Sequence, residues 1–240
     1  MNEPPASRRN PTRANYALMH KQVVSRQRVA DHGEVFTHER EVNAMLDLVR
    51  HETERIEARF LEPACGTGNF LAEILRRKLG VVQERYSKSQ LEFERYAVLA
   101  VSSLYGIDIL EDNTRLCRAR LFGLFDQVYS GLYHRTARPR CREAVEFILS
   151  RNIVWGDALT LHTAGENPQP LVFPEWSPVN GSLLKRRDFM FSFLVERTHQ
   201  FSLFNDEGEP GYISEPVREF PLVHFLEVGE MEPQRRQDAE

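Results

Sequence analysis

The 240-residue chain has little that would cross-link it or anchor it outside the cytoplasm. Its only cysteines are Cys65, Cys117 and Cys141, an odd number without CxxC or Cys/His spacing, which argues against a disulfide framework or a metal site. No apolar run approaches the roughly 20 residues of a membrane-spanning helix, and the first residues contain no apolar core of a secretory signal. We therefore expect a reduced, cytoplasmic protein without metal or membrane contact.

The chain also lacks an excess of positive charge. Its formal net charge is -4, which by itself does not indicate nucleic-acid binding. The charge is unevenly distributed, because residues 1–30 carry six basic side chains and one acidic one. Their composition favours a solvated, disordered tail. An arm that contacts phosphates is the alternative.

The apolar pattern predicts how the chain is organised. Short apolar runs at 59–62, 105–109 and 152–155 predict strands, and helical spacing between them predicts helices, one of them from Asn69 to about Leu79. Strands that alternate with helices imply an α/β fold with a mostly parallel sheet and helices on both faces. We expect a core domain at 16–165, a loop-rich extension at 166–230 that completes the sheet or contacts a partner, and disordered tails at 1–15 and 231–240.

The most informative run is Phe60-Leu-Glu-Pro-Ala-Cys-Gly-Thr-Gly-Asn-Phe-Leu71, in which a strand, a tight turn and a helix follow one another. Gly66 and Gly68 allow a sharp turn and let a ligand lie against the backbone without interference from a Cβ atom. Two glycines alone are weak support, because many turns contain them. The whole run resembles the S-adenosylmethionine (AdoMet) binding motif of the DNA adenine-N6 methyltransferases of restriction–modification systems, written there as PACGTGxF.

This resemblance implies a Rossmann-like fold of the class I AdoMet-dependent methyltransferases, with the motifs in γ order. It implies that the residues around the turn contact AdoMet, namely Glu62, Pro63, Ala64, Cys65, Gly66, Thr67, Gly68, Asn69 and Phe70. Upstream, residues 33–42 resemble the family's G-x-x-x-T-P motif, with Phe36 and Thr37 at the methionine end of the cofactor. His38 departs from the usual proline. A helix cap at Thr37 is the alternative explanation.

A second strand follows the order that the family requires. Tyr105-Gly-Ile-Asp-Ile109 resembles the strand whose acidic end accepts hydrogen bonds from the two ribose hydroxyls. Asp108 is therefore the ribose candidate, and Ile109 would pack on the adenine. The alternative for Asp108 is a helix cap, which is less attractive because Asp112 and Asn113 already suit that position.

A third strand end carries the last part of the resemblance. Residues 152–159 resemble the family's GDAL segment, in which Asp157 would meet the adenine amino group of the cofactor, beside Ala158. The four segments stand in the order of the family, and the resemblance covers residues 28–160, about half of the chain.

A further motif that the resemblance requires is missing. These enzymes carry [Asn/Asp/Ser]-Pro-Pro-[Tyr/Phe/Trp], whose Asn side chain and Pro carbonyl accept the hydrogens of the target amine while the aromatic ring stacks on the flipped base. The nearest string here is Asn167-Pro-Gln-Pro170. Asn167 and Pro168 are thus weak catalytic candidates, with an ordinary loop as the alternative.

The segment that follows also contains residues of interest. Trp176 could stack on a base or a partner, and the basic residues 185–187 could touch phosphates. A packed tryptophan and a solvated basic cluster are the equally open alternative.

Together the segments predict the AdoMet-binding part of a DNA adenine-N6 methyltransferase that acts on double-stranded DNA. A second polypeptide would supply the Asn-Pro-Pro-Tyr motif and target recognition. The alternative is a non-catalytic AdoMet-binding or scaffold subunit of a DNA-modification or defence complex. Methylation of RNA or protein fits the wording of the motifs less well.

Overall fold

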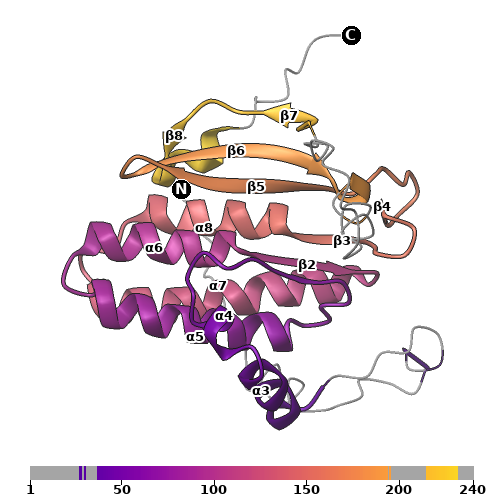
Figure 1. Ribbon diagram of the computed structural model, residues 1–240, viewed down its shortest axis with the longest axis horizontal. Coiled ribbons are helices and arrows are strands. Elements are labelled where there is room, and N and C mark those ends of the chain that lie inside the picture. Colours follow the sequence, from indigo (N-terminus) through magenta and orange to yellow (C-terminus); the bar gives the residue numbers. More distant parts are fainter. Residues whose placement is uncertain (1–26, 29, 31–36, 194, 196–214, 232–240) are drawn as a thin grey trace, which may run out of the picture.

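The computed structural model describes residues 27, 28, 30, 37–193, 195 and 215–231. The predicted tail at 1–15 lies outside this part of the chain, as does the tail at 231–240 apart from its first residue. That residue, Met231, was expected in a disordered tail, but it is buried at the end of a 3-10 helix. Layers of helices and strands alternate through the described part (Figure 1).

The first sheet is mixed and mostly parallel. Its strands, in spatial order, are β1 (Phe60–Glu62), β2 (Leu104–Asp108), β3 (Ile153–Asp157) and β4 (His162–Thr163). The first three are parallel, with Leu61 opposite Tyr105 and Ile107 opposite Val154, while β4 runs antiparallel to β3. Every residue of β2 is buried, because helices cover both faces of the strand. The predicted α/β class with a mostly parallel sheet is confirmed.

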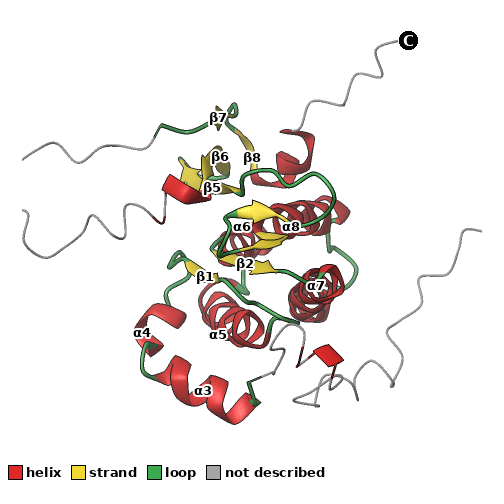
Figure 2. Cartoon of the chain, turned by 90° about the vertical axis from the view of Figure 1, so that its right-hand side faces the viewer, coloured by secondary structure: helices red, strands yellow, loops and turns green. Residues whose placement is uncertain are grey.

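Helices cover both faces of this sheet (Figure 2). On one face lie α5 (Asn69–Tyr86) and α7 (Glu111–Tyr133), and on the other lie α6 (Gln90–Ser102) and α8 (Pro139–Asn152). Two further helices, α3 (Glu39–Asp47) and α4 (Arg50–Thr53), pack beside α5. The connection from β1 to β2 and the connection from β2 to β3 therefore each contain one helix on each face of the sheet. None of the helices in the described residues is both long and apolar enough to cross a membrane.

The C-terminal part, which we expected to be a loop-rich extension that completes the sheet or contacts a partner, contains strands of its own. A second sheet is formed by β5 (Val172–Val179), β6 (Leu183–Met190), β7 (Arg218–Glu219) and β8 (Val223–His224), followed by the 3-10 helix η1 (Phe225–Met231). It packs over the outer side of α8 (Figure 1). Pro174 and Pro178, which suggest loops in the sequence, lie in β5. Within the part of the chain that the structure describes, this strand pairs only with β6, and an edge strand tolerates residues without a backbone N–H.

A buried lysine ties α5 to the start of β1. The side chain of Lys78 is fully buried, and its ammonium donates hydrogen bonds to the backbone carbonyls of Ile56 and Ala58 and to the hydroxyl of Ser103. Burial lowers the pKa of Lys78 to about 7. The three acceptors match the three donors of an ammonium group, which explains how the fold accommodates this residue.

This lysine should make folding stability depend on pH. The folded chain releases the proton of Lys78 near pH 7, whereas an unfolded lysine holds it up to about pH 10.4. Between these values the unfolded state binds more protons, so the contribution of Lys78 to stability rises with pH, by at most about 1.4 kcal/mol per unit. The free energy of unfolding of the wild type, measured with urea, should therefore rise relative to that of Lys78→Met from pH 7 to pH 9. Parallel pH curves for the two proteins would contradict this expectation.

Candidate functional site

The turn after β1 has the backbone geometry that its two glycines predict. Gly66 has φ 52° and Gly68 has φ 85°, both in the left-handed region, and α5 begins at the next residue. A Cβ atom on Gly68 would lie 2.6 Å from the Sγ atom of Cys117. Gly68 is the N-cap of α5 and offers no side-chain acceptor, so polar N–H groups at the start of the helix remain to be satisfied by another group.

Two buried thiols, those of Cys65 and Cys117, lie beneath the turn. All three cysteines are free and buried. A hydrogen-bonding contact with Cys117, together with burial, raises the pKa of Cys65, so its thiol stays protonated at neutral pH. Cys65 also donates its backbone N–H to the carbonyl of Ile107 (2.8 Å), which joins the turn to β2. These two cysteines therefore pack and position the turn.

The side chain of Asp108, at the end of β2, is hydrogen-bonded to the turn. Its Oδ2 atom accepts the N–H of Gly66 (2.7 Å), and its Oδ1 atom accepts from the N–H of Leu110 (2.9 Å) and the amide of Asn113 (3.1 Å). A carboxylate has about four acceptor positions, so about one remains for a ligand. Asp108 lies at the end of β2, and contact with a ribose stays a prediction. The sequence did not indicate these internal hydrogen bonds.

The expected caps of the following helix are corrected. α7 begins at Glu111 with Leu110 as its N-cap, and Asp112 and Asn113 lie inside its first turn. The side chain of Asp108 accepts the backbone N–H of Leu110, the residue just before the helix. Asp side chains commonly form such a turn with the residue two positions later. Sequence spacing could not distinguish these positions, because each of them carries a suitable side chain.

The end of β3 adds an acidic and an aromatic residue. Asp157 accepts the N–H of Leu159 (2.8 Å), and both Asp157 and Ala158 are half-buried. Asp108 lies opposite Trp155 in the parallel register, and the indole of Trp155 donates to the carbonyl of Ile109 (2.9 Å). The side chain of Ile109 remains 49% exposed. Trp155 was predicted only as part of a strand, and its contact with Ile109 adds it to the site.

The remaining predicted residues around the turn differ in exposure. Pro63 and Ala64 are exposed, while Thr67 and Phe70 are half-buried. Glu62 accepts a long hydrogen bond from the N–H of Ala64 (3.4 Å). Burial raises the pKa of Glu62, which this contact opposes. The carboxyl ends of three parallel strands thus each carry one acidic side chain at the same edge of the sheet.

Asn69 connects the turn to the upstream segment. Its amide nitrogen donates to the carbonyl of Thr37 (2.9 Å), and its amide oxygen accepts from Arg120 (2.5 Å), a residue of α7 that sequence reasoning missed. His38, in place of the family's proline, is the N-cap of α3 and accepts the N–H of Arg40. The cap therefore belongs to His38, and Thr37 lies at the turn. Phe36 lies outside the described residues.

The weak catalytic candidates lie on the surface of the molecule. Asn167 and Pro168 are exposed in the loop between β4 and β5. Trp176 is only 3% exposed and donates its indole N–H to Asn152 (2.9 Å), so of its two interpretations the packed one is correct.

The basic cluster 185–187 is engaged within the second sheet. Lys185 pairs with Glu219, Arg186 with Asp188, and Arg187 with Glu175. Arg186 is buried and its guanidinium lies over the rings of Trp176 and Phe220. These internal ion pairs explain the cluster without a phosphate.

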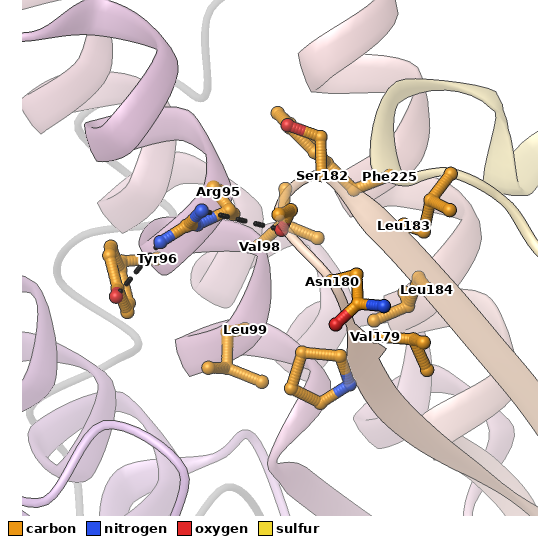
Figure 3. Close-up of a pocket in the computed structure, with 12 residues that line it drawn as sticks. Arg95, Tyr96, Val98, Leu99, Val179, Asn180, Ser182, Leu183, Leu184 and Phe225 are labelled. Atoms are coloured by element: carbon orange, nitrogen blue, oxygen red, sulfur yellow. Dashed lines mark hydrogen bonds between the residues drawn. The ribbon is translucent and has the colours of Figure 1, made fainter.

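A separate pocket of about 210 Å³ lies between α6 and the turn that joins β5 to β6 (Figure 3). Arg95 donates to the carbonyl of Gly181 (3.3 Å) and to the hydroxyl of Tyr96 (2.9 Å), and its guanidinium lies over the ring of Tyr96. The rest of the lining is largely apolar and includes Val98, Leu99, Leu183, Leu184 and Phe225. None of the predicted site residues that the structure describes lines this pocket.

Comparisons of the chain with protein-family models, curated proteins and solved structures found no match. The function of the carboxyl edge of the first sheet therefore has to be inferred from its geometry and from the motifs of the sequence. Open parallel α/β sheets commonly bind ligands at this edge, where glycine turns and helix N-termini meet.

Proposed function

We propose that the chain is the AdoMet-binding part of a DNA adenine-N6 methyltransferase with a Rossmann-like, class I fold. The observation that carries this proposal is the left-handed turn at Gly66 and Gly68, which is bonded to Asp108 at the next strand end. This arrangement is what a motif of the PACGTGxF type needs to hold a nucleoside against a backbone without side chains.

The side chains at this edge suit AdoMet by their chemistry. The cofactor has hydroxyl, amino and cationic groups, and the edge offers acceptors on Glu62, Asp108 and Asp157. The exposed Ile109 and the neighbouring Trp155 provide apolar surface for an adenine ring. When bound, AdoMet would supply a methyl group on a sulfonium, which an amine can accept directly.

A partner chain is part of the proposal. The chain lacks an Asn-Pro-Pro-aromatic motif, so its own residues do not account for holding the target amine. Within the described residues, β1 pairs on one edge only, with β2, and its Leu61 is 44% exposed. A strand of a second polypeptide could pair with that edge and bring the missing motif close to the turn. Double-stranded DNA would be the substrate of the complex.

The binding site is tested by Asp157→Ala. The substitution removes a carboxylate acceptor, and loss of one hydrogen bond to a charged group costs about 1.5–3 kcal/mol, so AdoMet affinity should fall at least about tenfold. Asp126→Ala is the matched control, because Asp126 bonds Ser130 and Arg142, outside the proposed site. Equal affinities of the two variants in equilibrium dialysis with labelled AdoMet would exclude Asp157 from the site.

A scaffold role is the second candidate, and one observation favours it. Asp108 already accepts three hydrogen bonds within the chain, so the turn is held together without a ligand. A subunit that kept the fold for assembly alone would form its complex equally well after Asp157→Ala. In a methyltransferase the same substitution would leave assembly intact and reduce methyl transfer.

A further inference from the structure

A residue far upstream in the sequence reaches the start of α7. Arg28 binds Asp112 with both terminal nitrogens, Nη1 to Oδ2 at 2.6 Å and Nη2 to Oδ1 at 3.2 Å, across 84 residues of sequence. The guanidinium of Arg28 holds the pKa of Asp112 below its usual range, so the pair is charged at neutral pH. The fork of an arginine side chain gives such a contact a defined geometry.

The same arginine contacts a buried amide. Its Nη2 atom also donates to the Oδ1 atom of Asn113 (3.2 Å), a residue that is only 2% exposed. Arginine has no acceptor, so this contact requires the amide oxygen of Asn113 to face Arg28. The amide nitrogen then faces the other way, where it donates to Oδ1 of Asp108 (3.1 Å).

The contacts form a continuous path to the glycine turn. Arg28 orients Asn113, Asn113 occupies Oδ1 of Asp108, and Oδ2 of Asp108 accepts the N–H of Gly66. Oδ1 of Asp108 already accepts two hydrogen bonds, from Leu110 and Asn113, and this fixes the orientation of the carboxylate. Its Oδ2 atom then faces the turn and any ligand bound there. Restraint of this kind, by residues that do not touch the ligand, commonly tunes a binding site.

We propose that Arg28 is a positioning residue for the AdoMet site, acting through Asn113 on the carboxylate of Asp108. The inference rests on the proposed function, because it assigns a role to Arg28 in the binding of AdoMet. An ion pair that is partly exposed contributes little to folding stability. The effect of Arg28 therefore falls on cofactor affinity, with little change in the stability of the fold.

The test is a titration of the full-length chain with AdoMet in wild type, Arg28→Gln and Arg28→Lys. Arg28→Gln should weaken AdoMet binding about tenfold. Arg28→Lys should give an intermediate affinity, because an ammonium supplies the charge without the fork. Arg50→Gln is the matched control: it breaks the exposed ion pair with Glu54 and should leave the affinity unchanged. Both glutamine variants should have the same melting temperature within about 2 °C.

A double-mutant cycle separates positioning from a general structural effect. In an Asn113→Ala background, whose folding is checked by circular dichroism, Arg28→Gln should have no further effect on AdoMet affinity. A tenfold loss that persists in this background would overturn the proposed path through Asn113. Wild-type binding that Arg28→Gln leaves unchanged would overturn the inference alone, whereas no binding by the wild type would overturn the proposed function with it.

Discussion

Replacing Gly68 with alanine is expected to reduce AdoMet affinity at least a hundredfold and to destabilise the chain by about 2–5 kcal/mol. The residue has φ 85°, a conformation that costs an L-residue about 1–2 kcal/mol. The new Cβ would also stand 2.6 Å from Sγ of Cys117, and overpacking of this kind costs about 1–3 kcal/mol. Relief of either strain moves the turn, which would displace the backbone that the proposed site uses. Urea unfolding and AdoMet titration measure the two effects.

The chain offers a matched control for this substitution. Gly80 lies inside α5, and a Cβ atom there would meet nothing within 4 Å. Gly80→Ala should therefore leave AdoMet binding unchanged and stabilise the helix by about 0.5–1 kcal/mol. Adding Cys117→Ala to Gly68→Ala should restore only part of the stability, because it removes the contact but not the backbone strain. Wild-type affinity in Gly68→Ala would contradict the assigned role of the turn.

Methyl transfer is expected only in a complex. The purified chain alone should leave double-stranded DNA unmethylated, because it has no Asn-Pro-Pro-aromatic motif to hold an adenine amine. Adding a polypeptide that carries this motif, with the product of a neighbouring gene as the first to try, should raise the incorporation of labelled methyl groups at least a hundredfold. Such an increase corresponds to about 2.7 kcal/mol of transition-state stabilisation, which positioning of reactants readily supplies.

The controls for this assay use the same variants. The activity of the complex should disappear with Gly68→Ala and persist with Gly80→Ala, and the label should be recovered as N6-methyladenine. Methylation by the isolated chain would show that the split-site proposal is wrong. Activity of the complex that survives Gly68→Ala would place the cofactor in the partner chain.

Local sequence signals predicted the part of the fold that carries the candidate site. The strand before Pro63, the turn at Gly66 and Gly68 and the helix start at Asn69 all follow from the preferences of neighbouring residues. The end of α5 did not. The helix was predicted to end at about Leu79, but it continues through Gly80 to Tyr86, because glycine inside a helix costs only about 1 kcal/mol and buried contacts offset it.

Features that depend on distant residues could not be predicted in this way. The contact of Arg28 with Asp112 joins positions 84 residues apart, and no periodicity relates them. Trp176 had two possible interpretations in the sequence, and its burial and its hydrogen bond to Asn152 on α8 decide for the packed one. Prolines in β5 suggested loops, since the sequence does not reveal that this strand lies at the edge of a sheet.

The most direct test of AdoMet binding at the carboxyl edge of the first sheet is calorimetric titration of the wild-type chain with AdoMet, with ATP as the control ligand. Saturable binding of one AdoMet per chain is the expected result, with no comparable binding of ATP. A folded chain that gives no saturable heat with AdoMet, and in which AdoMet does not raise the melting temperature, would contradict the assignment of this edge as a cofactor site.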